Sequence, residues 1–354
     1  MMTPQHPGKH WHEADRLFRE DEFWVGGDSA YSVPVGEDRA VWIFADTFIS
    51  ARGGERRSAD STMINNSVGI QDGLDPATGT MRFFWRRRAD GRPASFLGTD
   101  DHTFLWPCNA VLLDGRLLLF AMRVRSRKMT PEEYERAGNL ASFELVGWVA
   151  RLVENPLDDP DRWRVRDLDT GTCRFATTLG AGALLVDGDH LYAHASAGSD
   201  TRGQYLARWR IADAADGHLT DREWWFGPDA GWLSEHAPLP TVPAPTVDAP
   251  QTEFTVHRDA AGRLVWVQTD GLFRADIVVR EGERPEGPWT PFAPVYHPPE
   301  GDVEGGFVYG AKAHPEQRGA GGDLVLTYNN NALRSEMLMG RPELYYPTFV
   351  RVPR

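Results

Sequence analysis

The sequence predicts an all-β fold, a five-bladed β-propeller formed as one domain over residues 1–354. Short runs rich in Val, Ile, Leu, Phe and Trp recur along the chain, and Asp-Gly or Gly-rich turns separate them, which is typical of β-hairpins. Radial repetition of four-stranded units is how propellers protect their sheet edges, and five such units suit a chain of 354 residues. Helical periodicity is scarce; residues 130–140, which begin Thr130-Pro131-Glu132-Glu133, are the best helix candidate.

Five hairpins carry this prediction. The paired runs are 28–35 with 39–48, 110–113 with 116–122, 183–186 with 190–195, 254–257 with 264–269, and 308–313 with 324–328. They predict blades near 24–50, 64–125, 145–212, 252–292 and 305–352. We expect the terminal strand, 345–352, to pair into the blade formed by the N-terminus and so close the ring. The proline-rich segment 238–250 is interpreted as an extended crossing between two blades.

Composition excludes several classes of function. The net charge of -13 argues against a nucleic-acid partner, because phosphate binding needs a basic face. The basic clusters 86–88 and 123–128 are short and are interpreted as solvated surface. No apolar run is long enough to cross a bilayer, so no membrane partner is expected. The first residues lack the apolar core of a secretory signal, which favours a cytoplasmic protein over an exported mature form.

Metal and redox signals are weak. The two cysteines, Cys108 and Cys173, have no metal-type spacing and are expected to be free, with a disulfide as the alternative. The histidines at 6, 10, 12 and 297 have no carboxylates at a useful spacing for a metal centre. We therefore expect neither a metal ion nor any other cofactor.

Two aspartates at the start of the chain are the strongest functional signal. Asp28 follows Trp24-Val25-Gly26-Gly27, and Asp46 follows Val41-Trp42-Ile43-Phe44-Ala45, so each carboxylate lies in an aromatic, strand-like frame. Burying a carboxylate among apolar neighbours costs several kcal/mol unless it is paired or hydrogen-bonded. The pair is interpreted as acid/base groups; the alternative is that each Asp bonds backbone amides at a strand end.

If the first strand of every blade lines a central channel, further polar residues converge on these aspartates. A polyhydroxylated substrate needs acid/base groups, amides and a stacking ring, and the candidates offer all three. We expect Glu253 to be a catalytic carboxylate and the remaining candidates to bind substrate: Asn66, Trp106, Asn109, His257, Tyr309, Lys312, His314 and Asn329. Several have simpler interpretations, such as core packing for Trp106, a turn for the Asn329–Asn331 run, or a solvated edge for Glu253.

The opening segments resemble a bacterial propeller family labelled as a domain of unknown function (the 4185 type), some of whose relatives are endo-acting D-arabinanases. The resemblance is carried by Gly27-Asp28-Ser29-Ala30-Tyr31-Ser32-Val33-Pro34, Trp42-Ile43-Phe44-Ala45-Asp46-Thr47-Phe48-Ile49, Asn65-Asn66-Ser67 and Trp106-Pro107. The segments 284–289, 309–315 and 328–331 look like the later blades of arabinanase and invertase-type propellers. This resemblance implies furanoside hydrolysis, with Asp28 as the base and with Asp46 and Glu253 as further channel carboxylates.

Three functional hypotheses follow from these observations. The first is a glycoside hydrolase that acts on a furanoside or related carbohydrate, with Asp28 as general base and Asp46 or Glu253 as acid. The second is a cyclase or lyase of specialised metabolism that uses the same carboxylates on a small molecule. The third is a non-catalytic propeller that binds a carbohydrate. All three expect a small-molecule or carbohydrate partner.

Overall fold

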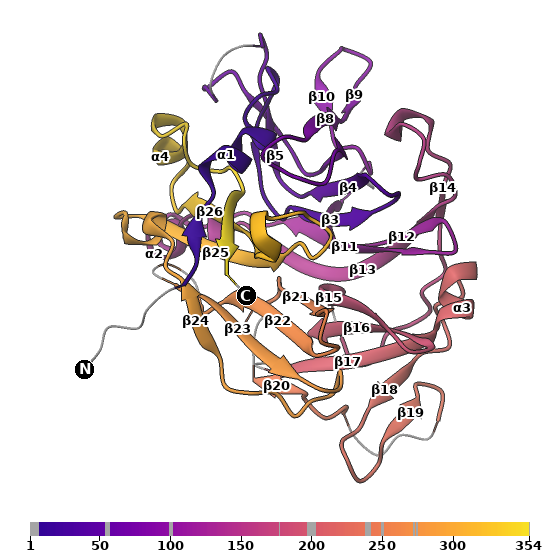
Figure 1. Cartoon of the computed structure of the whole chain (residues 1–354). Helices are drawn as coiled ribbons and strands as arrows, with labels where there is room; N and C mark the ends of the chain where they lie inside the picture. The colour runs from indigo at the N-terminus through magenta and orange to yellow at the C-terminus, as the bar shows by residue number, and fades with distance from the viewer. Residues whose placement is uncertain are drawn as a thin grey trace.

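The structure is a computed structural model, and it describes residues 7–53, 57–98, 102–176, 178–196, 203–237, 242–248, 251–271, 273 and 275–353. Within these residues, five antiparallel sheets of at least four strands each follow one another along the chain. In Figure 1 the colours run round the molecule in this order, from indigo at the top through magenta and pink on the right to orange and gold on the left. The predicted five-bladed propeller is confirmed.

Each blade is an antiparallel sheet of four strands, and the third continues into further strands. Blade one contains β3 (Tyr31–Pro34), β4 (Arg39–Phe44), β7 (Ser67–Asp72) and β8 (Thr80–Phe84). Blade two contains β11 (Phe104–Leu113), β12 (Arg116–Ser126), β13 (Phe143–Val153) and β14 (Val165–Asp167). Blade three contains β15 (Thr178–Asp187), β16 (His190–Ser196), β17 (Gly203–Arg210), β18 (Glu223–Trp225), β19 (Trp232–Ser234) and β20 (Val247–Asp248). Blade four contains β21 (Thr255–Arg258), β22 (Leu264–Thr269), β23 (Ile277–Gly282) and β24 (Ala293–Tyr296). Blade five contains β25 (Gly306–Ala313), β26 (Leu324–Ala332), β27 (Thr348–Val352) and β1 (Lys9–His10).

The five predicted hairpins are all present, and each forms the first two strands of its blade. The predicted blade limits are wrong for blades one to three, blade four extends past residue 292 to include β24, and blade five also contains β1. Strand β7 pairs with β4 and β8 pairs with β7, so residues 67–84 complete blade one, whereas the sequence places the segment 64–125 in blade two. Strand β13 likewise completes blade two instead of opening blade three. Long connections hid the outer strands, because the hairpin signal marks only strands joined by tight turns.

The ring is closed by the N-terminal strand, which joins the last blade, and not by the C-terminal strand joining the first blade as predicted. The C-terminal strand β27 stays in its own blade beside β26, and the N-terminal strand β1 pairs with it, Lys9 opposite Arg351 and His10 opposite Val350. The first strand of the chain therefore completes the last blade. The proline-rich segment 238–250 lies partly outside the described residues, and its residues 247–248 form β20 beside β17.

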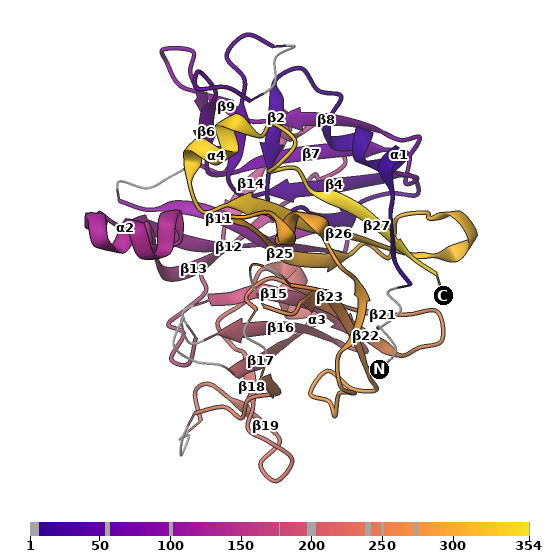
Figure 2. The same cartoon turned by 90° about the vertical axis from the view of Figure 1, so that its left-hand side faces the viewer.

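Shorter strands and helices lie outside the five blades. They are the strands β2 (Trp24–Gly27), β5 (Thr47–Ile49), β6 (Thr62–Ile64), β9 (Arg86–Arg87) and β10 (Pro93–Ala94), and the helices α1 (His12–Asp15), α2 (Pro131–Ala137), α3 (Ile211–Asp216) and α4 (Ser335–Gly340). The helix expected near 130–140 is confirmed as α2, which begins with a capping box between Thr130 and Glu133. Figure 2 shows α2 and α4 on the same side of the molecule, and Arg334 pairs with Glu135 at 2.8 Å between them.

The hydrophobic core lies between neighbouring blades. Val33, Val41 and Ile43 of blade one pack with Leu117 and Leu119 of blade two. This packing follows from the alternation of each strand, which presents apolar side chains to both faces of a buried sheet. Both cysteines are free, and among the described residues no helix is long and apolar enough to span a membrane.

Candidate active site

A cavity of about 550 Å³ opens where the inner strands of the blades begin. Asp28, Asp46 and Glu253 line it, together with Trp106 and Tyr309. A second cavity, about 330 Å³, is lined by the later residues of the same inner strands, including Pro34, Leu112, Arg258 and Glu316. The two cavities therefore lie at opposite ends of the central channel. The sequence correctly predicts that the three carboxylates share one cavity.

The backbone around Asp28 fixes its position against Asp46. The Asp28 amide donates to the carbonyl of Asp46 at 3.2 Å, and the Ala45 amide donates to the carbonyl of Asp28 at 3.1 Å. Ser29 and Ala30 then adopt left-handed conformations, with φ of 70° and 52°. Such angles are costly for residues other than glycine and tend to occur at functional sites. They turn the chain from β2 into the inner strand β3 directly after Asp28.

The Asp28 carboxyl group has one bonded oxygen and one unpartnered oxygen. Its Oδ2 accepts hydrogen bonds from the hydroxyls of Tyr309 at 2.5 Å and Tyr345 at 3.1 Å. Its Oδ1 is buried and has no hydrogen-bond partner among the described residues. Burial, with the nearby charges of Asp46 and Glu253, raises the pKa of Asp28 well above its ordinary value, and the two tyrosine hydrogen bonds oppose this shift. Asp28 is therefore the carboxyl group of this cavity best placed to hold a proton.

Asp46 is held by a different kind of donor. Its Oδ1 accepts from the indole Nε1 of Trp106 at 2.8 Å and from the amide Nδ2 of Asn65 at 3.1 Å. Burial raises the pKa of Asp46 above its ordinary value, and these two hydrogen bonds reduce the shift without reversing it. An N–H group can only donate, so Oδ1 of Asp46 must stay unprotonated, whereas a tyrosine hydroxyl can donate or accept. The donors favour an ionised Asp46 beside an Asp28 that can be protonated.

Glu253 is paired with a buried lysine. The ammonium of Lys312 bonds Glu253 Oε2 at 2.7 Å and the carbonyl of Gly310 at 2.8 Å, and it lies 4.5 Å from the ring centre of Tyr31. Burial lowers the pKa of Lys312, and the charges of Glu253 and Asp28 oppose this shift. The prediction that Lys312 lies near the carboxylates is confirmed. Lys312 does not line the cavity; it lies beneath Glu253, where its charge offsets the acidic cluster.

A bulge in β25 explains how Tyr309 and Lys312 both reach the site. Residues three apart on a regular strand point to opposite faces. The pairing register between β25 and β26 shifts between Tyr309 and Lys312, and Gly310 in this stretch has a left-handed φ of 59°. The extra residue re-aims the side chain that follows it. Asn329, opposite Tyr309, lies against Gly310 and is buried. Within the part of the chain that the structure describes, neither of its side-chain polar atoms has a hydrogen-bond partner.

Most of the cavity wall is apolar. Trp106 packs edge-on against Phe143 and Phe104, with ring centres 4.7 Å and 5.5 Å apart. Further aromatic, methionine and leucine side chains surround the acidic floor: Phe48, Met63, Met122, Leu140, Leu145, Phe307, Leu333 and Leu338. The cavity therefore combines a polar, acidic floor with broad hydrophobic walls.

Six predicted binding residues do not line this cavity: Lys312 and Asn329, which are described above, and four others. Asn66 is buried and bonds the backbone of Leu105 and Leu97, so its role is structural. Asn109, His257 and His314 line the second cavity. The reason is distance along the strand: His257 follows Glu253 by four residues, which is about 13 Å of extended chain. Residues of one inner strand thus reach opposite ends of the channel.

Sequence reasoning missed several residues of the site. Tyr345 bonds Asp28, and it has an unusual left-handed φ of 67° that no sequence pattern revealed. Asn65 bonds Asp46, whereas the sequence indicates its neighbour Asn66. Asn331 donates to the Tyr309 hydroxyl at 3.5 Å. The Asn-Asn dipeptide and the Asn329–Asn331 run were the available signals. Asn329 and Asn331 are two residues apart on β26, so strand alternation alone does not distinguish Asn331, which lines the cavity, from Asn329, which does not.

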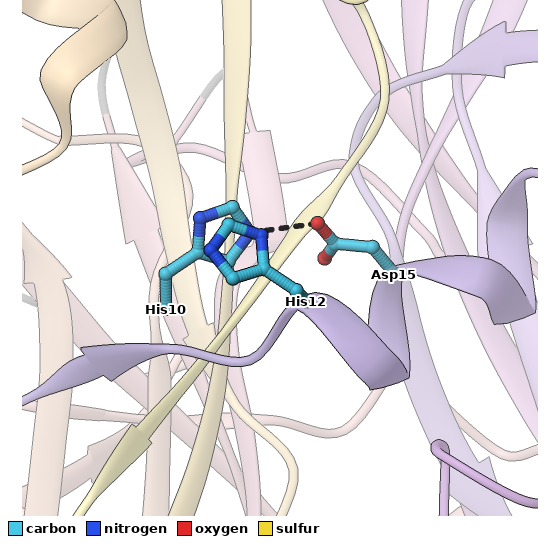
Figure 3. A group of neighbouring side chains, drawn as sticks. All are labelled: His10, His12 and Asp15. Atoms are coloured by element: carbon cyan, nitrogen blue, oxygen red, sulfur yellow. Dashed lines mark hydrogen bonds and ion pairs between the residues drawn. The ribbon is translucent and has the colours of Figure 1, made fainter.

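A separate cluster could hold a metal ion. His10, His12 and Asp15 each offer one ligand atom, and these atoms all lie within 4.8 Å of one another (Figure 3). The expectation that these histidines lack a carboxylate at useful spacing is therefore wrong, because the turn into α1 brings Asp15 back beside His10. His6 lies outside the described residues.

The sequence matches the model of a family described as a domain of unknown function (DUF5005), over residues 12–354. The chain belongs to this family. No curated protein matches the sequence. The matched family differs from the 4185 type expected above, and the likeness to endo-D-arabinanases stays a prediction.

The fold is similar to that of a proposed hydrolase from Bacteroides ovatus, with a TM-score of 0.72 and 15% identity over 97% of this chain and 89% of that one. An α-L-arabinofuranosidase catalytic domain from Coprinopsis cinerea matches with a TM-score of 0.49 and 10% identity, over 94% of this chain and 97% of that one. The α-L-arabinofuranosidase of Podospora anserina, in complex with cellotriose, matches with a TM-score of 0.48 and 9% identity, over 94% and 98%. The last two scores are too low to support an inference about function.

Proposed function

We propose that this protein is a glycoside hydrolase that acts on a furanoside or related carbohydrate, with Asp28 and Asp46 as its acid/base pair. The observation that carries the proposal is the unpartnered, buried Oδ1 of Asp28 in a cavity that two further carboxylates line. An orphaned carboxyl oxygen costs free energy in the empty protein, and a substrate hydroxyl or glycosidic oxygen would satisfy it.

The hydrogen-bond donors around the two aspartates indicate which one would act as the general acid and which as the general base. Asp28, whose pKa is raised, would protonate the leaving oxygen as general acid. Asp46, which accepts only from N–H groups, would take the proton of the attacking water as general base. This reverses the roles expected from the family resemblance. Glu253, neutralised by Lys312, would bind substrate hydroxyls, and it remains the competing candidate for the acid.

The walls suggest the class of substrate. A sugar ring would meet the acidic floor, and an apolar group joined to it would pack against Trp106, Phe143 and their neighbours. We therefore propose a small glycoside with an apolar or aromatic aglycone as the preferred substrate. The same walls favour the second candidate, a cyclase or lyase, because they would shield a reactive intermediate from water.

The experiment uses aryl and alkyl furanosides whose leaving groups differ in pKa, with wild type, Asp28→Asn, Asp46→Asn and the control Asp229→Asn. Asp229 is exposed and lines neither cavity. If Asp28 is the acid, Asp28→Asn loses about 100-fold or more on alkyl glycosides but much less on nitrophenyl glycosides, which need no proton. Asp46→Asn should lose activity on both, and azide should restore it.

The opposite pattern, with azide rescue of Asp28→Asn, would return the base role to Asp28. Full activity in both variants would refute the acid/base pair. If wild type cleaves no glycoside but converts an apolar small molecule in an Asp28-dependent reaction, the second candidate replaces the first.

A further inference from the structure

The segment that closes the propeller carries a cluster of ligand-type side chains away from both cavities. His10 belongs to β1, which pairs with β27, and His12 and Asp15 belong to the short helix α1. Figure 3 shows the two imidazoles and the carboxylate gathered at one point. None of the three residues lines either cavity. Any ligand bound there would act on the ring closure and not on the proposed reaction.

Asp15 is oriented as a metal ligand would be. Its Oδ1 accepts from the backbone amide of Phe349 at 2.9 Å, so Oδ2 is turned toward the histidines. That oxygen lies 2.7 Å from Nε2 of His10. Hydrogen bonds from outside the ligand set commonly fix ligands in this way. Asp15 is 6% exposed, and the Trp11 amide donates to the Phe349 carbonyl at 2.8 Å, which anchors the segment to β27.

The only interaction of the His12 side chain among the described residues is with His10. Its ring lies against that of His10 with centres 3.7 Å apart, and within the described part of the chain it makes no hydrogen bond or ion pair. The bond between His10 and Asp15 would hold the turn without it. His12 is exposed, which leaves room for a water molecule to complete a coordination shell. One charge works against a cation: Arg19 lies 4.0 Å from Asp15 Oδ2.

We infer that His10, His12 and Asp15 form a binding site for one divalent transition-metal ion, best matched by Zn²⁺, that fastens the N-terminal strand to the last blade. Two imidazole nitrogens, one carboxylate oxygen and an open position for water are a donor set that suits zinc. Binding replaces the proton shared by His10 and Asp15 with the metal ion, and the two ligand atoms separate to about 3.3 Å for tetrahedral bonds of about 2.0–2.1 Å.

The test is a titration of the metal-free, full-length protein with ZnCl₂ by calorimetry, with thermal unfolding in parallel. His12→Ala removes one ligand and leaves the His10–Asp15 bond in place, so its fold should survive. His218→Ala is the matched control, because His218 is also exposed but lies outside the cluster. We expect one Zn²⁺ per wild-type chain, at least a tenfold weaker affinity in His12→Ala and unchanged affinity in His218→Ala.

Because the ion would bind the folded chain alone, the unfolding midpoint of wild type should rise by about 4 °C at a Zn²⁺ concentration near 100 times Kd. His12→Ala should lose this shift. The inference is overturned if wild type binds no Zn²⁺, if His12→Ala binds it as tightly, or if the control loses binding to the same extent. None of these outcomes depends on glycosidase activity.

Discussion

Gly310 is the position where the geometry of the site can be tested most directly. A Cβ built there would lie 2.7 Å from Asn329 Nδ2 and 2.9 Å from both Glu253 Oε2 and Lys312 Nζ. These atoms would have to move by about 0.5 Å or more to reach ordinary contact distance. Gly310→Ala should therefore displace the Lys312–Glu253 pair beneath the cavity floor.

The cost has two parts that a control can separate. The left-handed φ of 59° costs an alanine roughly 1–2 kcal/mol, and the crowding adds roughly 1–3 kcal/mol. Gly115→Ala is the control, because Gly115 has a similar φ of 74° in the β11–β12 turn but nothing within 4 Å of its added Cβ. We expect Gly115→Ala to lose only the first part, measured by urea unfolding.

Activity should separate the two variants more clearly than stability. Since a misplacement of 1 Å can cost about 100-fold in rate, we expect about a tenfold fall in kcat for Gly310→Ala and none for Gly115→Ala. Replacing Lys312 by Ala in the Gly310→Ala background should recover part of the crowding energy, seen as non-additive stabilities. If Gly310→Ala matches Gly115→Ala in both stability and activity, the packing described around Gly310 is not that of the working protein.

Three further predictions concern buried titratable groups. The folded pKa of Asp28 is raised, so ionisation of Asp28 destabilises the folded protein as pH rises through that pKa. Asp28→Asn should therefore raise the unfolding midpoint at pH 8 more than at pH 4, while activity is lost. A larger gain at pH 4 would contradict the direction of this pKa shift. Lys312→Met should lose at least tenfold in activity but only about 1–2 kcal/mol of unfolding free energy in urea, because the apolar part of the side chain still packs and the partly exposed Glu253 can be hydrated. A loss of stability without a loss of activity would count against a role of Lys312 in the site. Burial lowers the pKa of His194 to about 3, and neither ring nitrogen has a hydrogen-bond partner among the described residues, so stability is lost as pH falls below about 6.5. His194→Phe should reduce the stability difference between pH 8 and pH 5. An unchanged difference would show that His194 is not the group responsible.

Local sequence patterns were sufficient to predict the two inner strands of every blade. Each inner hairpin joins two apolar strands through a tight turn, such as Asp114-Gly115 or Asp187-Gly188, and both features are visible in a short window of sequence. The outer strands follow longer connections, and some are only two or three residues long. Their placement depends on which sheet edge remains open. This is why the blade limits and the direction of ring closure were predicted wrongly.

The sequence by itself determined the propeller, the five inner hairpins and the acidic character of the channel, because strand alternation, turn residues and isolated carboxylates are local properties. Only the tertiary structure decided which end of the channel each polar residue reaches. Asp28 and Tyr345 meet across 317 positions, and His10 lies beside β27, through contacts that ring closure alone creates. Bulges such as the one at Gly310 also reset the alternation on which face assignments depend. The separation of Glu253 from His257, and the convergence of Tyr309 with Lys312, both follow from this long-range geometry.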